Sequence, residues 1–339
     1  MKGCFNLKRK IMTISTSLML VLSLTGCSRA KNDKVVASVN DKNITVSEYT
    51  QALKLNKGAI ESMYGTSIWD TEIEKGKKYS EFFKDSVLEQ MINTEVLYQQ
   101  AKKDNLLPSK EEVDKQFKEF QKEAKENKTY EENMKKLGIT DEDIKKEQEI
   151  GIAIQNYKDN FSKTTKISDE EMKKYYDDNK SEFYEDKVQA SHILIKTVDD
   201  NGKELSDKKQ EEAKKKAEDI LKKVKSGEEF AKLAKEYSED GSASNGGDLG
   251  FFTKGEMVPE FETAAWGLKP GEVSELVKTQ YGYHIIKVTD KLDKQLSFDD
   301  VKDTIKNNLL SEKFNTTVEK LVKEAKITKK EDVIKNIKF

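Results

Sequence analysis

Cysteine, histidine and proline are scarce in this sequence of 339 residues, which contains two cysteines, two histidines and three prolines. Pro108 is the only proline before residue 259, which is consistent with long helices that run without interruption. Cys4 lies in an N-terminal segment that we expect to be removed, so Cys27 is the only thiol expected in the mature chain. A single thiol excludes a disulfide framework and a zinc site built from cysteines.

An excess of charge of one sign is also missing. The formal net charge is −2, although 37% of the residues are charged, and acidic and basic side chains are interspersed. Such a pattern is typical of solvated helical surfaces. We therefore expect no nucleic-acid partner.

The N-terminus carries a basic segment, then an apolar run from Ile11 to Leu24, then Leu24-Thr25-Gly26-Cys27. This last stretch resembles the lipobox of bacterial lipoproteins, which implies a signal peptide of residues 1–26 and a diacylglyceryl group on the Cys27 thiol. Lipidation would leave no cysteine nucleophile. The alternatives are an ordinary secretory signal or a membrane helix, but the apolar run is short for a span.

Helical periodicity dominates most of the remaining chain. Residues 35–46 predict a hairpin around Asn40-Asp41, and helical patterns follow up to about residue 183. We expect one long helix to end near Leu106–Pro108. Three pairs of a serine and a glutamate three residues later predict capping boxes: Ser109 with Glu112, Ser168 with Glu171, and Ser226 with Glu229.

The middle of the chain has a different pattern. Residues 186–196 predict a strand, residues 207–225 a charged helix, and a second helix ends at Tyr237. A glycine-rich stretch follows, and residues 282–290 predict another strand. The expected order of β-α-α-loop-β-α-β indicates a compact α/β domain.

Helical stripes resume at about Ser297, for example at Val301, Ile305 and Leu309. They are too few to bury their own apolar faces, so we expect them to pack on the N-terminal helices. The predicted fold class is α+β, with an α/β domain inserted into a mainly helical domain made from both chain ends. The expected parts are the signal peptide 1–26, a lipidated tether 27–34, the helical domain 35–183 and 295–339, and the inserted domain 186–290.

Both histidines, His192 and His284, lie in apolar strands. Taken alone, each is most simply a hydrogen-bonded core residue. In strand register His192 shares a face with Ala190 and Leu194, and His284 with Ile286. If the two strands are neighbours, the imidazoles can meet and share one proton while both stay neutral.

The stretches "SHILIK" and "YSEDGSASNGGDLGFFTKGEMVPEFETAAWGLKPGEVSELVKTQYGYHIIKV" resemble parvulin-type peptidyl-prolyl cis/trans isomerases. The flanking stretches "VVASVNDKNITVSEY" and "INTEVLYQQAKKDNLLPSKEEVDKQF" resemble the chaperone portion of the SurA and PrsA lineage. Together with the lipobox, the whole chain resembles PrsA-type foldase lipoproteins.

The resemblance implies catalytic roles for the paired His192 and His284, for Asp240, and for the Thr279 hydroxyl that orients the pair. Some family members have a cysteine at the position of Asp240. This chain has no thiol there, so a covalent role for that position is excluded. The resemblance also implies a proline-ring pocket made of Leu249, Met257 and Phe261, with Phe252 beside them. The alternative is that these side chains simply pack in the core, but the histidines and Asp240 nearby favour a pocket.

The expected function is that of a membrane-anchored foldase, on the extracytoplasmic face of what we expect to be a Gram-positive cell membrane, acting on unfolded or newly exported proline-containing proteins. Rotation about an X-Pro bond makes and breaks no bond, so we expect no cofactor and no metal. The loop from Thr197 to Asp200 lacks a basic cluster, so we expect no phosphoserine-proline selectivity. The alternative is a holdase with a catalytically idle isomerase fold. A homodimer is left open.

Overall fold

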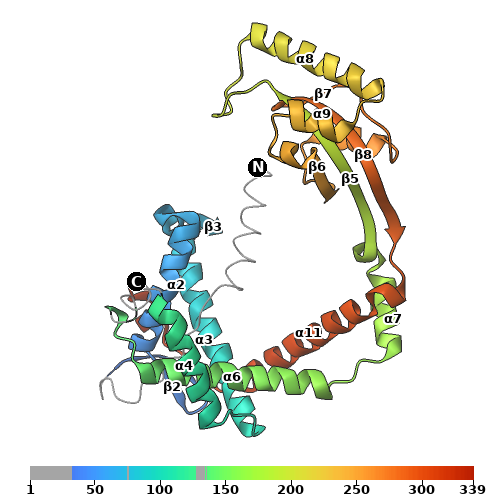
Figure 1. Ribbon diagram of the computed structural model, residues 1–339. Helices are drawn as coiled ribbons and strands as arrows, with labels where there is room; N and C mark the ends of the chain where they lie inside the picture. Colours follow the sequence, from blue (N-terminus) through green and yellow to red (C-terminus); the bar gives the residue numbers. More distant parts are fainter. Residues whose placement is uncertain (1–32, 75, 127–133, 135) are drawn as a thin grey trace. The chain divides into compact units, whose positions relative to one another are not determined.

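The computed structural model describes residues 33–339, except residues 75, 127–133 and 135. The described chain divides into two compact units, unit 1 with residues 33–167 and 307–339 and unit 2 with Ser168–Lys306 (Figure 1). Both ends of the described chain thus belong to unit 1, and the predicted α+β class with an inserted α/β unit is confirmed.

Unit 1 is mainly helical. Its helices include α2 (Val46–Tyr64), α3 (Tyr79–Lys103), α4 (Lys110–Glu126), α6 (Asp141–Thr164), α12 (Glu331–Lys335), a 3-10 turn η1 (Thr66–Asp70) and most of α11 (Phe298–Glu324). Its strands are β1 (Val35–Val39), β2 (Lys42–Thr45), β3 (Glu72–Glu74), β4 (Lys77–Lys78) and β9 (Ile327–Lys329).

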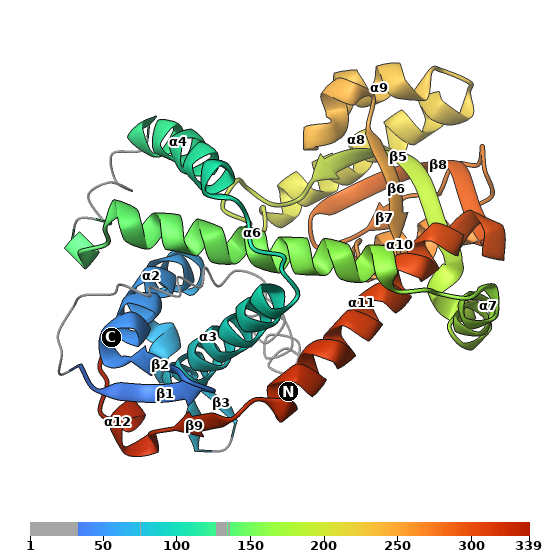
Figure 2. The ribbon, with the colours of Figure 1, turned by 90° about the horizontal axis from the view of Figure 1, so that it is seen from below.

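The predicted hairpin forms as β1 and β2, and Asn40 at its turn adopts a positive φ of 52°, a conformation that asparagine tolerates well. The sequence did not predict the third strand of this sheet, β9, which pairs antiparallel with β1 from Ala37↔Lys329 to Val39↔Ile327. Figure 2 shows β9 alongside β1. This pairing joins the two ends of the chain.

The core of unit 1 also draws on both chain ends. Phe339, the last residue, packs on Phe83 of α3 and on Trp69, with ring centroids 5.1 and 5.2 Å apart. Phe314 of α11 packs on Tyr157 and Phe161 of α6. The expectation that the C-terminal helical stripes pack on the N-terminal helices is therefore confirmed.

Unit 2 contains a four-stranded antiparallel sheet in the order β6-β5-β8-β7. The strands are β5 (Tyr184–Lys196), β6 (Asp248–Thr253), β7 (Val277–Lys278) and β8 (Gly282–Gln295). The helices and 3-10 turns are α7 (Asp169–Asp178), η2 (Lys180–Phe183), α8 (Asp207–Lys225), α9 (Phe230–Tyr237), η3 (Gly241–Asn245) and α10 (Pro259–Gly267). The two-residue strand β7 was not predicted.

Strand alternation divides the core of unit 2 into two layers. Ile193, Ile195 and Ile285 pack with the apolar residues of α8 and α9 on one face. Residues of the other face, Val188, Ala190, Ile286 and Val288, pack with α10. Both histidine strands were predicted to alternate in this way.

Beyond the sheet, β5 and β8 continue as a two-stranded ribbon whose last pair is Tyr184↔Gln295. Tyr176 of α7 donates its hydroxyl to the carbonyl of Leu296 at 2.6 Å and stacks on Phe183. For this reason unit 2 begins before and ends after the predicted range of 186–290.

Two of the three predicted capping boxes have support in the structure. Ser168 and Glu171 form a complete box, and the Glu112 N–H donates to Ser109 Oγ at 3.2 Å. The prediction for Ser226 was wrong: Ser226 ends α8, and α9 begins after Glu229 without a side-chain cap. Ser226 instead lies in the tight turn at the end of α8, where its hydroxyl donates to the carbonyl of Lys223. The long helix α3 ends at Lys103, slightly before the predicted end.

Across the part of the chain that the structure describes, no helix combines the length and apolar character needed to cross a membrane.

Candidate functional site

The two histidines of the chain meet in unit 2. In the β5–β8 ladder His192 lies opposite Ile286 and His284 lies opposite Leu194, so the imidazoles are diagonal neighbours on the face covered by α10. Their Nδ1 atoms are 3.2 Å apart, and both side chains are buried, with exposed fractions of 5% and 4%. The predicted meeting of the imidazoles across the sheet is thus what the structure shows.

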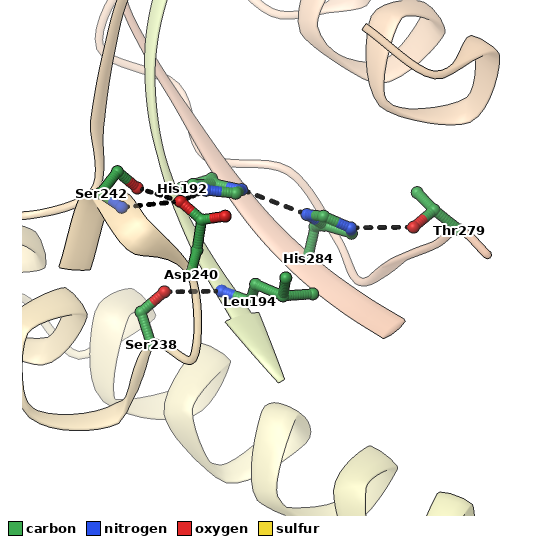
Figure 3. Close-up of polar contacts among 7 residues, drawn as sticks. All are labelled: His192, Leu194, Ser238, Asp240, Ser242, Thr279 and His284. Atoms are coloured by element: carbon green, nitrogen blue, oxygen red, sulfur yellow. Dashed lines mark hydrogen bonds and ion pairs between the residues drawn. The ribbon is translucent and has the colours of Figure 1, made fainter. Parts of the chain in front are cut away.

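Each imidazole has a polar neighbour at its other nitrogen (Figure 3). Thr279 Oγ1 lies 2.9 Å from His284 Nε2 and accepts the N–H of Tyr281 at 3.1 Å. Asp240 Oδ1 lies 3.1 Å from His192 Nε2. The result is a polar row that runs from Thr279 through both rings to Asp240.

Asp240 is held by its own loop. The N–H and the hydroxyl of Ser242 both donate to Asp240 Oδ1, at 2.8 and 2.6 Å. Burial alone would raise the pKa of the Asp240 carboxyl, but these hydrogen bonds and the neighbouring His192 hold the pKa well below its ordinary value. Asp240 is therefore an anion at neutral pH.

His284 is neutral under the same conditions. Burial lowers its pKa to about 4, and the neighbouring His192 lowers the pKa as well, while Asp240 opposes this shift. A buried neutral imidazole has one N–H donor and one acceptor nitrogen. The polar row thus holds a charged carboxylate at one end and a neutral ring toward the other.

These charges fix the direction of the hydrogen bonds. The anionic Asp240 favours the tautomer of His192 with its proton on Nε2, and in that tautomer Nδ1 is the acceptor. His284 must then donate from its own Nδ1, and Thr279 must donate its hydroxyl to His284 Nε2. The imidazole Nε2–H of His192 faces Asp240 without the alignment of a regular hydrogen bond, so it is available to another acceptor.

Gly247 permits the close approach of the glycine-rich loop to His192. Its φ is +80°, and its carbonyl accepts the backbone N–H of His192 at 2.9 Å. A Cβ at Gly247 would lie 2.1 Å from the carbonyl oxygen of His192. Only glycine therefore fits at this contact.

The apolar side chains predicted for the proline pocket form one cluster, and its Phe261 contacts both imidazoles. The Phe261 ring meets His192 and His284 edge to face, at centroid distances of 5.6 and 5.4 Å. Leu249 and Met257 are partly buried against the same apolar cluster. Phe252 is only 3% exposed and packs under Phe261 and against Trp266, which makes it a support of the pocket.

The structure thus brings together every predicted site residue except Cys27, which lies outside the described residues. Sequence reasoning missed Ser242, although an aspartate followed two residues later by a serine is a signal for a turn closed by the carboxylate. Within the described ranges, no group of histidine, cysteine, aspartate and glutamate side chains is arranged to hold a metal ion.

Comparisons with known proteins agree with both units. Residues 6–158 match the SurA-like N-terminal domain, and residues 170–292 match the PPIC-type PPIase domain. Over 342 residues the chain is 39% identical to the foldase protein PrsA of Caldanaerobacter subterraneus subsp. tengcongensis, which covers 97% of this chain and 99% of that protein.

Other matches carry the same description. The foldase protein PrsA of Clostridium botulinum (strain Langeland) is 32% identical over 337 residues, which cover 94% of this chain and 95% of that protein. The crystal structure of the peptidylprolyl isomerase PrsA from Bacillus anthracis has 30% sequence identity, covers 70% of this chain and 94% of that chain, and aligns with a TM-score of 0.28.

Proposed function

The chain belongs to the PrsA foldase family and is a peptidyl-prolyl cis/trans isomerase, and we propose that it folds exported proteins from a lipid anchor outside the cytoplasmic membrane. The resemblance seen in the sequence is confirmed at the level of the family and the activity. The roles of individual residues, the anchor and the clients are the proposal.

The apolar pocket gives the reaction its binding site. Rotation about an X-Pro bond faces a barrier of roughly 18–20 kcal/mol, because the planar amide is stabilised by resonance. The planar amide is also more polar than the twisted one. A pocket of Leu249, Met257 and Phe261 therefore binds the pyrrolidine ring and favours the twisted amide by removing water from it.

The polar row acts on the rotating carbonyl. Resonance places negative charge on the carbonyl oxygen of the planar amide, and the anionic Asp240 beside it disfavours that form. The imidazole Nε2–H of His192, which lacks an aligned partner, can donate to the prolyl nitrogen, whose lone pair is released as the amide twists. His284 and Thr279 keep His192 in the tautomer that has this N–H.

The observation that carries the catalytic assignment is the pairing of His192 and His284 beneath Phe261, with Asp240 at the open end. A holdase with an idle isomerase fold would have no need for this arrangement. Client binding by the helical unit is compatible with both functions, and a homodimer is compatible with both as well.

The test is the rate of cis/trans exchange of a proline-containing tetrapeptide with the chain from Ser28 to Phe339. Asp240→Ala should lower the rate about 10- to 100-fold, because it removes the carboxylate charge that disfavours the planar amide. Asp219→Ala on α8, where the side chain is 71% exposed, is the matched control and should leave the rate unchanged. Full activity of the Asp240 variant would favour the holdase.

A further inference from the structure

The outer edge of β5 changes its partner at the candidate site. β6 pairs with β5 as far as Ser191↔Asp248, and the backbone N–H of His192 donates to the carbonyl of Gly247. Past this point, among the described residues, no strand pairs with that edge. The buried backbone of Leu194 would leave unpaired polar groups unless another segment supplied partners.

The segment after α9 supplies those partners from its side chains and its backbone. The Leu194 N–H donates to Ser238 Oγ at 3.1 Å (Figure 3). The Leu194 carbonyl accepts the backbone N–H of Glu239 at 2.8 Å. The Lys196 N–H donates to Glu239 Oε2 at 2.8 Å. Two consecutive residues thus replace a strand along this edge.

The loop that carries Asp240 is therefore fixed to β5 at both ends. Gly247 fixes one end at His192, and Ser238 with Glu239 fixes the other end at Leu194. Asp240 directly follows the second attachment point, so its distance from His192 depends on where Ser238 is held.

We infer that Ser238 is a positioning residue for catalysis, whose hydroxyl sets the place of Asp240 beside His192. This inference rests on the role proposed for Asp240. The Ser238 hydroxyl itself does not touch the imidazoles. It satisfies a backbone donor on the strand that carries His192, and so ties the carboxylate to that strand.

The carboxylate of Glu239 is the weaker of the two side-chain attachments, whereas its backbone N–H stays bonded to the Leu194 carbonyl. Its side chain is exposed, and its carboxylate is shared between the Lys196 N–H and Lys216 Nζ of α8, the latter at 2.8 Å. Water can replace an exposed acceptor, whereas the Leu194 N–H beside Ser238 has a buried setting. Loss of the Ser238 hydroxyl should therefore have the larger effect.

The experiment compares Ser238→Thr with Ser238→Val in the chain from Ser28 to Phe339. These two variants have the same shape, but only threonine keeps the hydroxyl. We expect the threonine variant to keep at least half of the isomerisation rate and the valine variant to lose about 3- to 10-fold. Ser238→Ala, which introduces no branched side chain, replaces the valine variant should that chain fail to fold.

A merely structural role is separated by repeating each substitution in the Asp240→Ala background. If Ser238 acts through Asp240, removal of its hydroxyl there should change the rate by less than twofold. An equal loss of rate in both backgrounds would overturn the inference, and so would full activity of the valine and alanine variants.

The NMR signal of the His192 Nε2 atom gives a second readout that needs no activity. It should shift when the Ser238 hydroxyl is removed and stay in place with threonine. If Asp240→Ala itself leaves the rate unchanged, the proposed role of Asp240 fails. The signal then still tests the placement: an unmoved His192 signal in the valine variant contradicts it.

Discussion

The two imidazoles share a hydrogen bond between their Nδ1 atoms, so a change to one ring alters the state of the other. His284 is neutral because it is buried, and His192 keeps its tautomer because Asp240 and His284 lie at its two nitrogens. At the residue scale, the site is a row in which each group determines the proton position of the next.

The first prediction concerns this coupling. His192→Ala and His284→Ala should each lower the isomerisation rate. Part of the loss arises because each change leaves the buried Nδ1 of the remaining imidazole without its hydrogen-bond partner, at a cost of about 1–3 kcal/mol. The double variant should lose less free energy of activation than the sum of the single losses. Exchange rates of all three variants, measured with their melting temperatures, test this. Strictly additive losses would show that the rings act independently.

The second prediction concerns pH. The chain has two histidines, so NMR of the imidazole carbons can follow each of them. The His284 signal should titrate near pH 4, because burial lowers the pKa to about 4 from an ordinary value of 6.5. The unfolded chain takes up a proton below about pH 6.5, so the stability that comes from His284 is complete above that pH.

This stability contribution is lost as the pH falls from about 6.5 to about 4. The melting temperature of unit 2 should fall over the same window. A His284 titration centred between pH 6 and 7 would contradict the neutral buried ring.

At the element scale, α6 contains an acid on its buried face. Glu147 continues the spacing of Asp143, Ile150, Ala153 and Tyr157, which are buried. Its Oε1 atom is buried without a hydrogen-bond partner among the described residues. Burial raises the Glu147 pKa to about 9, with a smaller contribution from Asp143.

The third prediction follows from the sign of this shift. A raised pKa means that the folded chain holds the Glu147 proton more strongly than the unfolded chain does. The contribution of Glu147 to stability is therefore complete below about pH 4.5 and is lost as the pH rises toward 9. Glu147→Gln is neutral throughout and should melt higher than the parent chain at pH 8, by about 2–4 °C for each kcal/mol.

The matched control for the third prediction is Glu142→Gln, an exposed glutamate on the same helix. At pH 5 the Glu147 variant and the parent should melt alike. Equal melting temperatures of the two chains at pH 8 would show that the Glu147 carboxyl is charged in the folded protein.

The elements differ in how far the sequence determined them. Both long strands and the histidine face were predictable, because apolar alternation is a local signal. β7 and β9 were missed, since strands of two and three residues are defined by the partner they pair with, β8 and β1. Ser226 misled because a serine also suits the end of a helix, and the choice depended on the turn that follows.

The site shows the same division. The motif carried the positions of His192 and His284, but their opposite proton roles depend on distances to Thr279 and Asp240 that no local pattern contains. The sequence suggested no role for Ser238, which directly follows the predicted helix end at Tyr237. Its function depends on an edge of β5 that is distant in the sequence.

At the scale of the whole molecule, the fourth prediction concerns the anchor. Cys27→Ala should prevent lipidation and release the protein from the membrane fraction, because Leu24-Thr25-Gly26-Cys27 follows the apolar run. Fractionation of cells and electrophoretic mobility measure this, with Cys4→Ala as the control that should change neither. A Cys27 variant that stays with the membrane at unchanged mobility would contradict the lipoprotein reading.

The fifth prediction concerns unit 1, whose sheet and core are closed by the end of the chain. Replacing Ser168–Lys306 with a short glycine-serine linker should leave unit 1 folded, since Phe314 already packs on Phe161 near the point of joining. Circular dichroism should show helices and a cooperative melt.

The matched contrast for this last prediction removes only residues 325–339. This much smaller deletion should destabilise unit 1, because it takes away β9, which pairs with β1, and Phe339, which packs on Phe83 and Trp69. A molten excision product beside a stable truncated one would refute the insertion architecture. If the excised chain folds and still suppresses aggregation of an unfolded protein while lacking isomerase activity, the holding and isomerising functions belong to separate units.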